Sequence, residues 1–200
     1  MAEGLAGKRL LVVEEALKGR VGHWYEYVKS VAELNQREGV AVTVGAHCQI
    51  DPAIAAEINA HPLFARTNWD GVYAHPRAWW RYLGIARHNW LVLRTMNRFV
   101  RQHGPFDCLF APTVVIHHIW GWRLLLLVQR KRIGRMVLLF RNNAGAYAPG
   151  SSTPFFKRSA KVFEWALRSF VGVLRKGRAA FATDSTRLAR EYELLCGIAP

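Results

Sequence analysis

The feature that most constrains this chain is a repeated alternation of short apolar runs with longer helical patterns. Each apolar run is too short for a helix, and most are flanked by Gly, Pro, Asp or Asn. Strands are predicted at Arg9–Val13, Val40–Ala46, Asp107–Ala111, Met136–Arg141 and Ala179–Thr183. Helices are predicted at His23–Arg37, Pro52–Asn59, Pro76–Arg101, Val114–Arg130, Pro154–Lys176 and Thr186–Leu195. This alternation predicts an α/β fold with a Rossmann-like open parallel sheet flanked by helices.

The length and composition fit one such domain. The chain has 200 residues, of which 51% are hydrophobic and 21% charged, so it can bury a sizeable core. We therefore expect residues 1–200 to form a single Rossmann-like domain. The last predicted helix is followed closely by Pro200. We expect a further segment to continue the fold beyond that point.

Positive charge is concentrated in the middle of the chain. The formal net charge is +14, and residues 71–163 hold a single acid, Asp107, against fifteen lysines and arginines. A localised excess of this size favours an anionic partner or surface. The composition leaves open whether that partner is a membrane, a nucleic acid or an anionic substrate.

The cysteines indicate a reducing compartment. Cys48, Cys108 and Cys196 are odd in number and widely spaced, with no CxxC pair. This pattern predicts neither a disulfide framework nor a structural metal site, and it favours a cytoplasmic location. The longest apolar stretch, Val114–Val128, contains two histidines and an arginine and falls short of the ~20 residues of a membrane span.

A basic amphipathic helix is predicted within Pro76–Arg101. At about 100° per residue, Arg87, Arg94, Arg98 and Arg101 fall within about 60° of one another. An adjoining face carries Trp79, Ala86, Trp90, Leu93 and Val100. Arginine beside tryptophan favours contact with anionic lipid headgroups and predicts a peripheral position at the inner face of a membrane. The alternative is a core helix whose arginines are only solvated.

Glycines follow the first strand, where a Rossmann fold binds phosphate. Gly19 and Gly22 lie before the helix that begins at His23, but they do not form the GxGxxG pattern. The second strand ends in Ala46-His47-Cys48, where a ribose-binding acid would stand. The sequence therefore argues against NAD or FAD at this turn. For Gly19 and Gly22, the alternative to phosphate binding is a plain connecting turn.

Two segments carry a resemblance to a known family. Val21-Gly22-His23-Trp24-Tyr25-Glu26-Tyr27, together with Phe181–Ala189 entering the last helix, resembles the N-terminal half of a GT-B glycosyltransferase of the retaining family-four type. The resemblance implies a nucleotide-sugar donor, a glycan or lipid-linked acceptor, no further cofactor and no metal. It places Gly22 and His23 beside the donor phosphates. It also implies a C-terminal donor-binding domain, without which this chain is inactive.

Candidate catalytic residues follow the third predicted strand. His117 and His118 come shortly after it, near the sheet edge where α/β proteins bind ligands. The resemblance implies that one of them contacts the acceptor or the transferred sugar, and spacing does not choose between them. The alternative is one histidine packed under the sheet and one at the surface. Zinc is not expected, because adjacent histidines on a helix diverge by about 100°.

Polar residues follow the last two predicted strands as well. Arg141, Asn142 and Asn143 offer a charge and several hydrogen-bond donors to a sugar or phosphate. Asp184 and Ser185 follow the final strand. They fit either the lining of a substrate site or a simple helix N-cap.

These features together predict the acceptor-side half of a glycosyltransferase. The alternative is a non-catalytic basic α/β module that binds an anionic membrane or a nucleic acid. Nucleic acid is the less favoured partner, because the sequence contains no helix-turn-helix, zinc-finger or RNA-binding motif.

Overall fold

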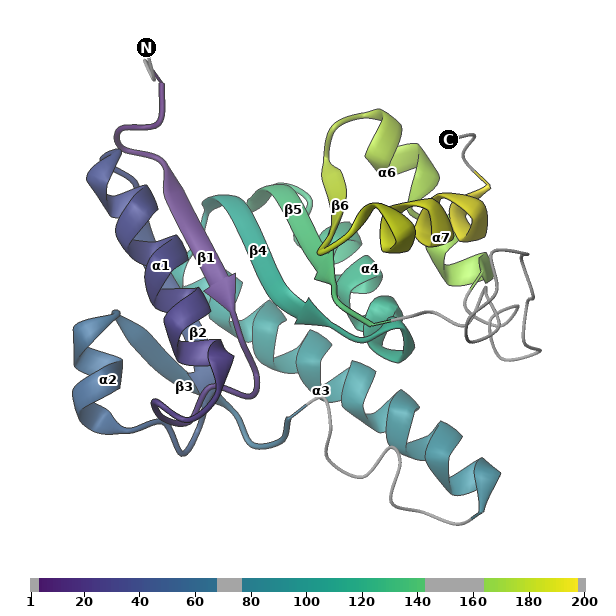
Figure 1. Ribbon diagram of the computed structural model, residues 1–200, viewed down its shortest axis with the longest axis horizontal. Coiled ribbons are helices and arrows are strands. Elements are labelled where there is room, and N and C mark those ends of the chain that lie inside the picture. Colours follow the sequence, from purple (N-terminus) through teal and green to yellow (C-terminus); the bar gives the residue numbers. More distant parts are fainter. Residues whose placement is uncertain (1–3, 68–76, 143–163, 198–200) are drawn as a thin grey trace.

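Six parallel strands form the centre of the protein. A computed structural model describes residues 4–67, 77–142 and 164–197 (Figure 1). The strands are β1 (Arg9–Val13), β2 (Ala41–His47), β3 (Ala60–Phe64), β4 (Phe106–Val114), β5 (Ile133–Phe140) and β6 (Ala179–Thr183). Their order across the sheet is β3-β2-β1-β4-β5-β6, and every neighbouring pair is parallel. The predicted Rossmann-like α/β fold is confirmed. That residues 1–200 form one domain stays a prediction.

Helices cover both faces of this sheet. They are α1 (His23–Arg37), α2 (Pro52–Glu57), α3 (Ala78–His103), α4 (Ile119–Val128), α6 (Val171–Arg175) and α7 (Thr186–Cys196), and residues 164–168 are also helical. In Figure 1, α1 lies in front of the sheet and α3 and α4 lie behind it. Within the described residues, no helix is long and apolar enough to cross a membrane.

The alternation of side chains along each strand divides the core into two clusters. On β1, Leu10 and Val12 join the cluster under α1 and α2, whereas Leu11 and Val13 join the cluster under α3 and α4. A strand that is buried on both faces needs apolar side chains at successive positions. The sequence of β1, Arg-Leu-Leu-Val-Val, therefore has four consecutive apolar residues after Arg9.

One asparagine joins α3 to the chain that follows β4. The Asn89 side-chain amide donates hydrogen bonds to the carbonyls of Ile85 (2.8 Å) and His117 (3.0 Å). Its carbonyl oxygen accepts a hydrogen bond of 2.6 Å from the Gly121 amide. Asn89 is buried, so these bonds satisfy polar groups that water does not reach. They fix the middle of α3 against the turn that carries the two candidate histidines.

The structure differs from the predicted elements at several places, and one is the predicted helix Pro154–Lys176, which is interrupted between residue 168 and α6. β3 was not predicted, because its five residues include Pro62, which is tolerated on an edge strand. β4 extends to Val114 and a 3₁₀ turn spans Ile116–His118, so α4 begins at Ile119 rather than at Val114. Two helices were predicted to begin at Pro76 and Pro154. Both of these residues lie outside the described residues.

Gly134 on β5 offers a test of the sheet packing. A Cβ at this position would lie 2.5 Å from the Asp107 carbonyl oxygen on the neighbouring strand. Gly134→Ala should therefore lower the free energy of unfolding by about 1–3 kcal/mol, measured by urea denaturation. Gly172→Ala is the matched control, because nothing lies within 4 Å of its added Cβ. Equal stability of the two variants would contradict the packing of β5 against β4.

Candidate functional site

The candidate site lies beyond the carboxyl ends of β1 and β4. In the order β3-β2-β1-β4-β5-β6, the chain runs outward from β1 in one direction and from β4 in the other. Open α/β sheets bind ligands outside the carboxyl ends of the strands at this switch of direction. The residues that immediately follow β1, β4, β5 and β6 therefore define the region of interest.

Glu14 is a buried carboxyl at the end of β1. It is 2% exposed, and Oε1 accepts a hydrogen bond of 3.1 Å from the Ala16 amide. Burial raises the pKa of Glu14 to about 7, and neighbouring Glu15 adds to the rise, whereas Thr113, Ala16 and Arg141 oppose it. A carboxyl with this pKa exchanges protons near neutral pH.

Glu15, the next residue, meets two stacked histidines. Glu15 Oε2 lies 2.9 Å from His88 Nε2, a charge pair when His88 is protonated. The His88 and His118 rings stack with centroids 3.9 Å apart at 23°. All three residues are buried. The end of β1, the middle of α3 and the turn after β4 therefore meet through ionisable side chains.

His118 is the most deeply buried of the candidate histidines. It is 2% exposed, and burial lowers its pKa to about 2, with further lowering by His88 and His117. Within the described ranges, neither ring nitrogen of His118 has a hydrogen-bond partner. His118 is therefore neutral at physiological pH. His117 is half-buried, and burial also lowers its pKa.

An arginine and an aspartate join the ends of β5 and β6. Arg141 Nε lies 2.9 Å from Asp184 Oδ2, and the guanidinium stands 5.5 Å from the Tyr27 ring centroid. The Tyr192 hydroxyl donates a hydrogen bond of 3.1 Å to the Asn142 carbonyl. Arg141 therefore connects the strand ends to α1.

Ser185 has the structural role that sequence analysis left as an alternative. Its Oγ accepts a hydrogen bond of 3.3 Å from the Leu188 amide and caps α7. Asn143 lies outside the described residues. The predicted site residues Arg141, Asn142, Asp184 and Ser185 therefore gather at the ends of β5 and β6, with His117 and His118 after β4.

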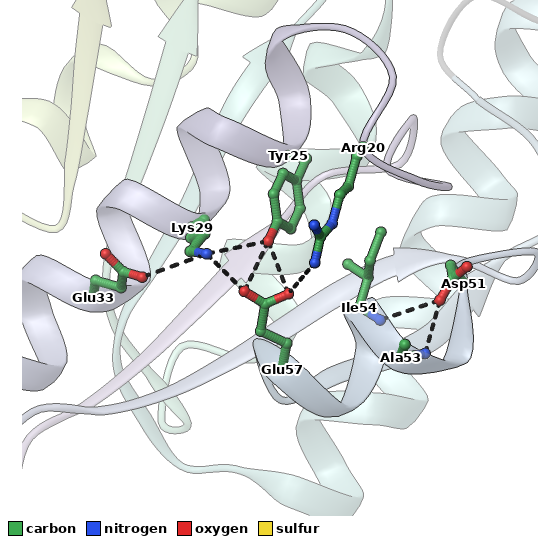
Figure 2. Close-up of polar contacts among 8 residues, drawn as sticks. All are labelled: Arg20, Tyr25, Lys29, Glu33, Asp51, Ala53, Ile54 and Glu57. Carbon is green, nitrogen blue, oxygen red and sulfur yellow. Dashed lines mark hydrogen bonds and ion pairs between the residues drawn. The ribbon is translucent and has the colours of Figure 1, made fainter.

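The turn between β1 and α1 is fixed by a carboxylate on α2. Both Glu57 carboxylate oxygens lie 2.8 Å from the Tyr25 hydroxyl, and Oε1 lies 2.7 Å from Lys29 Nζ (Figure 2). Arg20, within the turn, reaches Oε2 at 3.3 Å. The pKa of Glu57 is lowered chiefly by the hydrogen bond from Lys29 and then by that from Tyr25. Gly22 and His23 are exposed at the end of this tethered turn.

Gly22 has a backbone conformation that favours glycine. Its φ is +80°, and an added Cβ would lie 3.0 Å from the Trp24 ring. It precedes α1, whose N-terminus has no side-chain cap. Gly22 is therefore a constrained helix entry, and its predicted place beside a phosphate stays a prediction.

The predicted basic helix is α3, but its apolar residues are divided between the core and the solvent face. Val100 is buried in the core, whereas Trp79 and Trp90 are 52% and 60% exposed on α3. The tryptophans therefore share the solvent face with Arg87 and the arginines after it. The structure does not bear out one continuous apolar face running from Trp79 to Val100.

Sequence analysis missed three of the buried ionisable residues. Glu14 and Glu15 directly follow the first strand, and that position was a usable signal for both. His88 carried no signal, because it lies within a helix and meets Glu15 only through the tertiary fold. Among residues 4–67, 77–142 and 164–197, no group of three His, Cys, Asp or Glu side chains is arranged to hold a metal ion.

Comparisons with known proteins find structural likeness only. No model of a protein family matches the chain, and no curated protein matches it. Among solved structures, FabI from Alistipes finegoldii has a TM-score of 0.45 and 16% identity, covering 90% of this chain and 69% of that one. The NADH enoyl-[acyl-carrier-protein] reductase from Aquifex aeolicus VF5 has a TM-score of 0.40 and 12% identity, covering 96% and 79%.

These findings overturn the glycosyltransferase prediction. The structures found are FabI and an NADH-dependent reductase rather than a GT-B domain, so the predicted family, enzyme class, nucleotide-sugar donor and glycan acceptor are wrong. The non-catalytic membrane or nucleic-acid module gains no support from them as the function of the chain. One of these structures is named for NADH, so the expectation of no cofactor is not kept. At 12% and 16% identity, the neighbours assign no substrate to this chain.

The turn after β1 does not fit a dinucleotide bound in the Rossmann manner. Such a turn presents glycine amides to the diphosphate, but here Glu14 and Glu15 follow β1 directly. The Ala16 amide already donates to the Glu14 carboxylate, and Leu17 is fully buried. β2 ends at His47, which cannot accept hydrogen bonds from a ribose as a carboxylate does. We derive no chemical step through a dinucleotide at this turn.

The pKa of Glu14 makes stability depend on pH. A folded-state pKa of about 7 lies above the ordinary 4.5, so the neutral carboxyl stabilises the fold fully below pH 4.5, and this contribution is lost as the pH rises to about 7. Relative to Glu14→Gln, the wild type should lose roughly 3 kcal/mol of unfolding free energy across this window and no more above it. Urea denaturation at several pH values measures the difference. If the unfolding free energies of the wild type and Glu14→Gln changed equally with pH, the pKa of Glu14 would be that of an ordinary carboxyl.

Proposed function

We propose that the protein transfers a proton to or from a small anionic substrate at the carboxyl edge of the sheet. Glu14 is the acid–base group in this proposal, and Arg141 binds the substrate's anionic group. The observation that carries it is the position of the Glu14 carboxyl, which is buried directly after β1 and hydrogen-bonded to the Ala16 amide; this burial raises its pKa to about 7. General acid–base catalysis is most efficient when the pKa of the group lies near the working pH.

Arg141 is suited to the anion because only part of its guanidinium is engaged. Nε binds Asp184, and within the described residues no acid is paired with its Nη atoms. The side chain is 27% exposed. Electrostatic interaction between Arg141 and Glu14 lowers the pKa of that carboxyl, which supports a common site. A planar guanidinium with free N–H groups binds a carboxylate or phosphate well.

The proposed step balances without another reactant. Ionised Glu14 takes a proton from a substrate carbon next to a carbonyl group. The electron pair of the C–H bond forms a C=C bond, and the π pair of the carbonyl group moves onto its oxygen. Return of a proton from Glu14 to the same or a neighbouring carbon restores the enzyme. Arg141 orients the substrate by its anionic end and stabilises the developing negative charge.

The remaining predicted site residues have supporting roles in this proposal. Half-buried His117 contacts the substrate, whereas buried His118 holds its position through the stack with His88. Gly22 and His23 border the site from α1, and Asn142 from β5. Asp184 orients Arg141, and Ser185 fixes the start of α7.

Solvent exchange at carbon tests the acid–base role. The purified protein is incubated in D₂O with a panel of small keto acids and phosphorylated carbonyl compounds, and deuterium incorporation is followed by proton NMR. We expect one class of these compounds to exchange its carbon-bound protons for deuterium. The exchange rate should rise with pH up to about 7 as Glu14 ionises. Glu14→Gln should slow this exchange by about 10²-fold or more.

Glu33→Gln is the matched control, because it removes an exposed carboxyl on α1. It should exchange at the wild-type rate. Equal exchange by Glu14→Gln and wild type would remove Glu14 from the reaction. No exchange of any compound by the wild type would contradict the proposed reaction class.

We also propose that the protein acts in the cytoplasm, peripheral to the inner face of the membrane. All three cysteines are free thiols, which supports a reducing compartment. One face of α3 supports the peripheral position, and we name it the α3 stripe. It consists of Trp79, Trp80, Leu83, Arg87, Trp90, Arg94, Arg98 and Arg101, all exposed. Tryptophan and arginine together suit the boundary between lipid headgroups and chains.

Charge reversal on the α3 stripe tests the peripheral position. The triple change Arg87→Glu, Arg94→Glu and Arg98→Glu should abolish cosedimentation with vesicles rich in anionic phospholipid. The matched control reverses three exposed cations elsewhere, at Arg135, Arg175 and Lys176, and should retain most of the binding. Persistent binding by the α3 triple variant would exclude the α3 stripe as the contact.

A further inference from the structure

A groove beside α3 lies next to the α3 stripe. It lies between β3 and α3 and has a volume of about 400 Å³, and a second hollow of about 510 Å³ is lined by neighbouring residues of the same helix. Arg94, Arg98 and Gln102 line both hollows, and Arg101 lines the second. The two hollows share the side chains of Arg94, Arg98 and Gln102 and are together called here the β3–α3 groove.

The charge of the β3–α3 groove is uncompensated. Within the described residues, Arg94, Arg98 and Arg101 form no ion pair with an acid, and the 26 residues of α3 include no Asp or Glu. Three guanidinium groups at spacings of four and three residues lie on one helical face. Their mutual repulsion makes an anion between them favourable.

The floor of the groove is apolar. Pro62, Leu63, Leu91 and Phe99 line it, and Phe99 is 3% exposed. His103 stacks on Phe99 with ring centroids 4.4 Å apart, and His61 meets the Phe99 edge at 5.1 Å. Burial lowers the pKa of His61, and His103 lowers it further, so His61 is neutral at pH 7. A polar rim above an apolar floor suits an amphiphilic anion.

We propose that the β3–α3 groove binds the phosphomonoester headgroup of an anionic phospholipid. Arg94, Arg98 and Arg101 bind the phosphate oxygens, and the apolar floor contacts the glycerol and the first carbons of the acyl chains. This inference rests on the proposed peripheral position. A monoester is favoured over a diester because it carries more charge and an additional free oxygen for bidentate arginine contacts.

The tryptophans of the α3 stripe select a lipid rather than a soluble phosphate as the source. Trp79 and Trp80 stack with ring centroids 4.0 Å apart and are 52% and 43% exposed, and Trp90 is 60% exposed. Rings of this kind prefer the interfacial zone of a bilayer. They lie on the same face of α3 as the arginines of the groove, so one bilayer surface contacts both.

Charge-matched vesicles test the headgroup preference. One set contains phosphatidate in phosphatidylcholine, and the other contains phosphatidylglycerol adjusted to the same zeta potential. The wild-type protein should bind the phosphatidate vesicles about tenfold more tightly. The double variant Arg94→Gln/Arg98→Gln should lose this preference while retaining some binding through the rest of the α3 stripe.

Arg135→Gln/Arg175→Gln is the matched control, since it removes two exposed positive charges outside the groove. It should keep the preference. Equal binding of both vesicle sets by the wild type would overturn the headgroup site but leave the peripheral position intact. No binding to either set would overturn both. Glycerol phosphate that competes at the affinity of the lipid would show that the groove takes a soluble phosphate instead.

Discussion

The contact between Glu15 and His88 joins the end of β1 to α3, the longest helix among the described residues. Glu15 follows β1 directly, and His88 lies near the centre of α3, so the 2.9 Å separation fixes how α3 crosses the sheet. Asn89, the next residue on α3, fixes the same helix to the turn after β4. These two adjacent side chains hold the turn that carries His118, whose ring stacks on that of His88.

This arrangement places several ionisable groups where water is scarce. Burial disfavours the charged form of an isolated acid or base, which is why the pKa of Glu14 rises to about 7 and that of His118 falls to about 2. Partners that favour the charged form of Glu14, namely Thr113, Ala16 and Arg141, only partly offset burial. A raised pKa of an acid and a lowered pKa of a base, both at the carboxyl edge of a parallel sheet where the strand order reverses, are typical of sites that transfer protons. Stability alone would favour apolar side chains in these positions.

Much of the fold could be predicted from the sequence, whereas much of the site could not. Continuous apolar runs marked β1, β2, β4, β5 and β6, because parallel strands are buried on both faces. The edge strand β3 carries Pro62 and is less buried, so its run was too weak to detect. The ends of the predicted strands directed attention to Arg141 and His118, whose functional roles stay predictions. The Glu15–His88 contact joins residues far apart in the sequence and had no local signal.

The resemblance to a glycosyltransferase rested on short segments whose structural roles are now visible. Gly22 enters α1 with a positive φ, and Ser185 caps α7. Helices that follow parallel strands need such residues whatever the protein binds, so these segments identify a helix entry rather than a family. Of the fifteen lysines and arginines of the middle segment, five lie on α3, and four of these belong to the α3 stripe.

The central claim is that Glu14 stays protonated up to neutral pH within the folded protein. The most direct measurement is a titration of the Glu14 side-chain carboxyl by carbon-13 NMR, with the signal assigned from Glu14→Gln. The account predicts a midpoint at about pH 7. A midpoint near the ordinary 4.5 would show that Glu14 is solvated, and the proposed acid–base site would then have no basis.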